Sequence, residues 1–90
     1  MSASVVLSSL SNGVFADIVQ LALPPASPVS SALLTRLSEL GFLPGERVAI
    51  LRRGPGGREP LAVQIGETLF ALRQAEADCI LVAALDKDAN

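Results

Sequence analysis

The 90-residue sequence has no histidine, no tryptophan, no tyrosine and a single cysteine. Without histidine it cannot build a Ser-His-Asp or Cys-His nucleophilic site, and it has no imidazole general base. One cysteine can neither close an internal disulfide nor supply the Cys/His set of a structural zinc site. The fold must therefore be held by its apolar core, as suits a reducing cytosol.

Charged residues are also scarce, at 18% of the chain, and the formal net charge is −2. This balance does not provide the phosphate-neutralising surface of a nucleic-acid-binding protein. Three phenylalanines are the only aromatic residues, so stacking platforms for single strands are missing too. We expect no nucleic-acid partner, although Arg52, Arg53 and Arg58 make one local basic spot.

Long apolar runs are absent as well, although 50% of the residues are apolar. A transmembrane helix needs about 20 consecutive apolar residues, and no stretch approaches that length. No lysine or arginine precedes Arg36, so the positively charged start of a signal peptide is missing. The sequence predicts a cytoplasmic protein without direct membrane insertion.

Apolar periodicity and turn residues predict five short strands. The expected strands are residues 15–23, 47–53, 61–65, 68–72 and 79–83, and residues 73–77 suit one helical turn. In the second strand, Val48 and Ile50 should face one side and Arg47, Ala49, Leu51 and Arg53 the other. Pro44-Gly45 has the type II turn signature, Gly66-Glu67 suits a tight turn, and residues 54–60 read as a loop without regular structure.

One long helix is expected between the first two strands. Its apolar stripe comprises Val29, Leu33, Leu37 and Leu40. Ser27 can cap it with Pro28 at the first helical position, or Ser30 can cap it later. Gly41 is expected as a left-handed C-cap.

Five strands and one helix in so short a chain favour a mainly β fold, a small barrel sealed on one side by the helix. We expect one domain over residues 1–85 and a flexible C-terminal tail over 86–90. Cys79 should be a small apolar core residue.

The order of these pieces resembles the FeoA family, ferrous-iron transport protein A. The matching pieces are Leu37 to Gly41, Pro44-Gly45, Val48 to Ile50, Pro55 to Pro60, Val63 to Gly66 and Ala71 to Val82, with a looser match at Leu7 to Leu10 and Asn12-Gly13. Two departures stand out. Asn12 occupies a usual proline position, and Gly57-Arg58-Glu59-Pro60 replaces a common Gly-Asp-Pro.

The resemblance implies an SH3-like five-stranded barrel that assists the ferrous-iron transporter FeoB, whose cytosolic part is a G-protein domain. The alternative is a metal-responsive regulatory domain resembling the C-terminal barrel of iron-dependent repressors. A free barrel edge, or the 79–83 strand, could support a weak homodimer. Neither an enzyme activity nor a cofactor is expected. The carboxylates form no spaced ligand motif, so we predict no dedicated metal site and only adventitious surface binding.

A partner surface is expected between residues 40–43 and the 54–60 loop. Phe42 and Leu43 are candidate anchors there, although the pattern favours packing of both into the barrel mouth. Arg52, Arg53 and Arg58 could present cations to a GTPase. Alternatively, they could lie at the solvated end of a hairpin and keep strand edges from pairing. Arg73 and Glu76, at i and i+3, could form a local ion pair, tether the helical turn to the barrel or contact a partner.

Overall fold

The structure is a computed structural model that describes residues 4–27 and 30–84. Pro28 and Val29, at the expected start of the long helix, lie outside the described residues, and so does the expected tail at 86–90.

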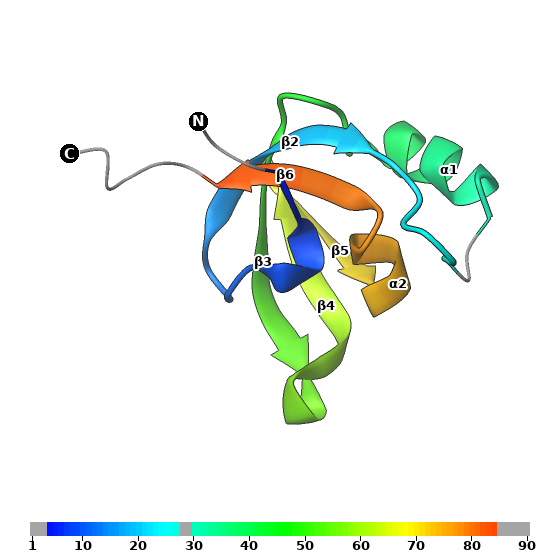
Figure 1. The fold of residues 1–90 in the computed structure, drawn as a ribbon. Coiled ribbons are helices and arrows are strands. Elements are labelled where there is room, and N and C mark those ends of the chain that lie inside the picture. Colours follow the sequence, from blue (N-terminus) through cyan, green and yellow to red (C-terminus); the bar gives the residue numbers. More distant parts are fainter. Residues whose placement is uncertain (1–3, 28–29, 85–90) are drawn as a thin grey trace.

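Six strands form one antiparallel sheet in the order β1-β6-β2-β3-β4-β5 (Figure 1). They are β1 (Val5–Val6), β2 (Phe15–Leu21), β3 (Arg47–Gly54), β4 (Arg58–Ile65), β5 (Thr68–Leu72) and β6 (Ile80–Ala84). The mainly β prediction is confirmed, with β1 as an additional strand that is too short to show periodicity. The expected closure is wrong, because β1 and β5 remain the two edges of the sheet.

The long helix, α1, spans Ala32–Leu40 and begins later than predicted. Its N-cap is Ser31, which makes no side-chain capping hydrogen bond, and not Ser27 or Ser30. Gly41 ends the helix in the left-handed conformation, at φ 114°, which confirms the predicted C-cap. Figure 1 shows α1 at the periphery, beside one end of the curled sheet.

A second, short helix, α2 (Gln74–Ala77), follows β5 as expected. Glu76 does not pair with the Arg73 guanidinium; its Oε1 accepts a hydrogen bond from the Arg73 backbone N–H at 2.7 Å. Among the described residues, the ion pair that forms joins Arg47 to Asp17 at 3.3 Å, with both side chains exposed. Glu76 therefore acts as a helix cap, and the ion pair, one of the three alternatives for these two residues, does not form.

The core lies inside the curl of the sheet and contains apolar side chains from every strand from β2 to β6. Its largest fully buried members are Phe42, Leu7, Leu37, Ile50, Leu61 and Ile80. Leu7 comes from a single 3-10 turn, η1 (Leu7–Ser9), that follows β1. Cys79 is fully buried in this cluster, which confirms its predicted packing role.

A bulge in β3 changes which side chains face the core. The β3–β4 register shifts between Ile50 and Arg52, so Arg52 lies opposite Ala62 and Arg53 lies opposite the buried Leu61. Strict alternation predicted Arg53 on the outer face, and the bulge reverses that.

The segment 54–60 is more regular than predicted. A short turn, η2 (Pro55–Gly57), in which Gly56 and Gly57 have left-handed φ values, links β3 to β4, which starts at Arg58. A Cβ on Gly54 would lie 2.3 Å from the Glu59 carbonyl oxygen, so the approach of the two strands requires glycine.

Candidate functional site

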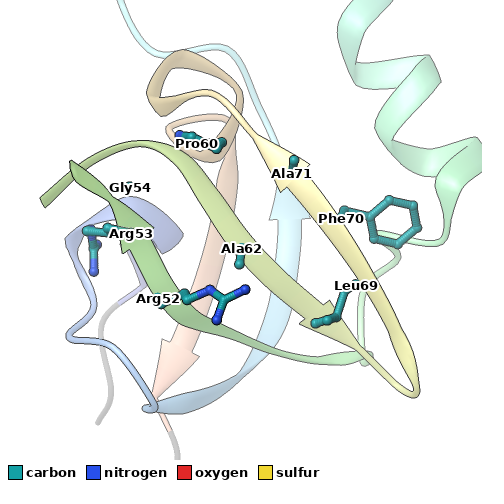
Figure 2. A pocket seen from close by; sticks show the side chains of 8 residues that line it. All are labelled: Arg52, Arg53, Gly54, Pro60, Ala62, Leu69, Phe70 and Ala71. Carbon is teal, nitrogen blue, oxygen red and sulfur yellow. The ribbon is translucent and has the colours of Figure 1, made fainter.

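The candidate site is an open hollow of about 370 Å³ that is lined by residues of β3, β4 and β5. It is lined by Arg52, Arg53, Gly54, Pro60, Ala62, Leu69, Phe70 and Ala71 (Figure 2). We call it the outer hollow. Two of its members, Arg52 and Arg53, are residues that the sequence analysis selected.

Small side chains form the floor of the outer hollow. Ala62 of β4 lies directly opposite Ala71 of β5, and Arg52 of β3 lies opposite Ala62 on the other side. The three residues therefore form one row across the sheet, with a cation at one end. Leu69 borders the row and is 59% exposed, more than any other large apolar side chain described.

Arg52 and Arg53 are neighbours in sequence, but they have different environments. Arg52 is exposed and extends across β4 in Figure 2. Arg53 Nη2 donates to the carbonyl oxygens of Ser8 at 2.8 Å and Leu10 at 3.0 Å, and Nη1 donates to Asn12 Oδ1. Arg53 thus fastens the N-terminal segment to β3, so its guanidinium is committed within the fold.

Arg58 lines a different hollow, of about 500 Å³, together with Gly57, Glu59 and Gln74. There Glu59 Oε2 accepts a hydrogen bond from the backbone N–H of Gln74 at 2.5 Å, which ties the β4 start to α2. Arg58 itself is exposed. The three predicted arginines therefore do not form one cationic cluster.

The predicted apolar anchors also separate. Phe42 is 0% exposed and its ring lies 5.3 Å from that of Phe70, at 53°, so it belongs to the core and cannot anchor a partner. Leu43 is 43% exposed. Packing into the barrel mouth is thus correct for Phe42 and wrong for Leu43.

The groove expected between residues 40–43 and 54–60 is not formed. Figure 1 places the η2 turn at one end of the molecule and α1 at another. Sequence analysis missed Leu69 and the two alanines beside Arg52, because only strand register brings them together. The alternation of 68–72 would have indicated that Leu69 and Ala71 share a face.

The part of the chain that the structure describes gathers no set of metal ligands. Within residues 4–27 and 30–84, no three Cys, Asp or Glu side chains lie close enough to hold one together. Burial raises the pKa of the Cys79 thiol, and the nearby Asp78 and Glu76 carboxylates raise it further. The protonated thiol is a poor ligand and a poor nucleophile. Among the described helices, none has the length and apolar character needed to cross a membrane.

Comparison with known proteins decides the family. The model of the FeoA domain matches residues 5–84. The chain belongs to the FeoA family. Membership implies an accessory role in ferrous-iron transport, and FeoA is not known as an enzyme family.

Solved FeoA structures have the same fold. FeoA of Stenotrophomonas maltophilia is 42% identical to this chain, with a TM-score of 0.73 over 86% of this chain and 87% of that one. That protein was solved with zinc and is described as a prokaryotic SH3 domain protein and a candidate ferrous-iron transport activating factor. Iron(II) transport protein A of Clostridium thermocellum is 38% identical, with a TM-score of 0.73 over 89% of this chain and 45% of that one. These matches confirm the SH3-like prediction. No curated protein matches the sequence.

A manganese-dependent transcriptional repressor shares the fold alone. It is 18% identical, with a TM-score of 0.74 over 94% of this FeoA chain and 44% of the repressor chain. Such a likeness does not favour a regulatory role for this chain over a transport role.

Proposed function

We propose that this FeoA protein is a cytoplasmic accessory factor that binds the G-protein domain of a FeoB-type ferrous-iron transporter and regulates it by binding, without chemistry of its own. The observation that carries this proposal is the family match over residues 5–84. The description of the Stenotrophomonas maltophilia relative as a candidate activating factor supports the same role.

The outer hollow is the surface that best suits such binding. It offers an apolar floor, the exposed Leu69 and a cation at Arg52 that makes no ion pair among the described residues. Arginine beside apolar contacts is enriched where protein interfaces gain most of their energy. Of the predicted contact residues, Arg52 is therefore the first choice. Leu43 and Arg58 are secondary candidates outside the hollow, and Arg53 supports the surface without contacting the partner.

The test measures binding to the purified cytosolic domain of the transporter by calorimetry. Arg52→Glu should weaken binding about tenfold or more, as expected when an interface arginine is reversed. Arg36→Glu is the matched control, because it makes the same charge change at an exposed position on α1. Equal effects of the two variants would move the docking surface elsewhere, and no binding by the parent protein would refute the proposal.

A second measurement separates regulation from passive assembly. The GTP hydrolysis rate of the transporter domain, measured with and without a saturating concentration of this chain, should change if the chain regulates the domain. The Arg52→Glu variant should need a higher concentration to produce the same change. Binding with an unchanged hydrolysis rate would contradict the regulatory part of the proposal.

A further inference from the structure

The second edge of β5 has no strand beside it. Within the described residues, β5 pairs with β4 on one side and ends the sheet on the other. Exposed edges are usually protected by charge, proline or a bulge. The β5 sequence, TLFAL, has neither charge nor proline, and its register with β4 is unbroken from Thr68 to Leu72.

The turn before β5 determines which backbone groups face this edge. Gly66 and Glu67 form a two-residue turn with Gly66 at φ 57°, and Ile65 lies opposite Thr68. In such a hairpin the residues flanking the turn form a hydrogen-bonded pair, and pairs alternate from there. The N–H and C=O groups of Leu69 and Ala71 therefore point away from β4, to the open edge.

The side chains along this edge are complementary to a second copy of themselves. In an antiparallel pair centred on Phe70, Leu69 lies opposite the partner's Ala71, and the reverse contact forms as well. The large, 59% exposed Leu69 thus meets a small residue that floors the outer hollow. Phe70 lies opposite the partner's Phe70 at a non-hydrogen-bonded position, where cross-strand side chains approach most closely.

The charged residues at the two ends of β5 fit the same antiparallel pairing centred on Phe70. Glu67 and Arg73 stand at equal distances in sequence from Phe70, so each faces its opposite charge on the partner. Both are exposed, and neither forms an ion pair among the described residues. Arg73 has extended backbone angles, φ −84° and ψ 161°, so strand geometry continues to it.

We propose that two copies of this chain associate through β5 as an antiparallel pair centred on Phe70, with ion pairs between Glu67 and the partner's Arg73 at both ends. The result is one continuous sheet across the dimer. The edge is short compared with a standard interface of about 800 Å² per partner, so the dimer is weak and forms at high protein concentration. This inference does not depend on the proposed function.

Sedimentation equilibrium of the purified chain tests the charge pattern. Arg73→Glu should weaken association about tenfold, because two exposed ion pairs are lost and two repulsions are created. The double variant E67R/R73E should restore it, and Arg36→Glu should leave it unchanged. A parent chain that stays monomeric, or an Arg73→Glu variant that associates like Arg36→Glu, would overturn the proposal.

Disulfide trapping tests the register. Residues of a hydrogen-bonded antiparallel pair have Cα atoms about 5.5 Å apart, within disulfide range. A mixture of Leu69→Cys and Ala71→Cys chains should therefore form a covalent dimer on mild oxidation, far more than Leu69→Cys alone. The native Cys79 is buried and does not interfere. Equal trapping in both samples would reject this register. Failure of the dimer would leave the Arg52 binding test unaffected, since Arg52 lies on β3.

Discussion

Of the two edges of the sheet, the one at β1 is short and fastened, whereas the one at β5 is longer and bare. β1 has two residues and leads directly into η1, whose Leu7 is buried in the core. Arg53 holds the carbonyl oxygens of Ser8 and Leu10, and the Ser8 hydroxyl donates to Asp78. Among the residues that the structure describes, β5 has no comparable hydrogen bonds on the side away from β4.

The difference shows two ways in which an open sheet can end. At β1 the chain leaves the sheet quickly and is fixed by packing and hydrogen bonds, so little backbone is left for another chain to pair with. At β5 the strand keeps free donors and acceptors next to apolar side chains. The first edge contributes to stability, and the second is the edge that the proposed dimer would use.

The largest expected effect compares one leucine from each edge. Leu7→Ala should lower the free energy of unfolding by about 2–5 kcal/mol, because it leaves a cavity in a well-packed core. Leu69→Ala should change it by less than about 0.5 kcal/mol, because the side chain is exposed. Urea unfolding at low protein concentration measures both. Similar losses would contradict the contrast between the edges.

The next effect separates the two adjacent arginines. Arg53→Met should cost about 1–3 kcal/mol of stability, since it keeps the apolar stem but leaves two backbone acceptors without their charged donor. Arg52→Met should be nearly neutral in the same urea experiment and serves as the matched control. If both variants were equally stable, Arg53 would not fasten the β1 edge.

A smaller loss is expected at the hydrogen bond between η1 and the residue after α2. Ser8→Ala removes the hydroxyl that donates to Asp78, and the expected cost is about 1 kcal/mol because the contact is half-buried. Ser9→Ala is the control, because its hydroxyl bonds only to the Val6 carbonyl oxygen at an exposed site. Hydrogen exchange of β1 should speed up more in Ser8→Ala than in Ser9→Ala.

The smallest effect appears only in alkaline solution. Cys79 lies just before β6, the strand that pairs with β1, and burial raises the pKa of its thiol above the unfolded value. The folded chain therefore holds this proton more tightly, so the associated stability is complete below about pH 8.5 and declines as the pH rises through the folded pKa. Thermal unfolding from pH 7 to 10 should show a steeper decline for the parent than for Cys79→Ala.

Much of the fold could be predicted because local signals and tertiary structure agree. The 68–72 strand is found with its predicted bounds, and the 47–53 and 79–83 strands are displaced by one residue at most at either end. Gly41 ends α1 and Pro44-Gly45 forms a turn, as their backbone preferences predict. Gly45 has φ 93°. β1 was missed because a strand of two residues is too short to show an alternating apolar pattern.

The site was harder to predict because one bulge decides it. Periodicity assigns Arg53 and Arg52 to opposite faces, but the extra residue after Ile50 exchanges those faces. Phe42 illustrates another difficulty, since a phenylalanine beside a Pro-Gly turn suits either a core or a docking surface. Only the position of Phe70 on β5, opposite Val63, shows that Phe42 has a ring to pack against.

Asn12 has a consequence for how this chain relates to its family. Its amide oxygen accepts a hydrogen bond from the Arg53 guanidinium. The proline expected at this position has no side-chain acceptor and could not form this bond. A proline at position 12 would therefore leave Arg53 with its two backbone acceptors, Ser8 and Leu10, and without the side-chain acceptor that this chain adds.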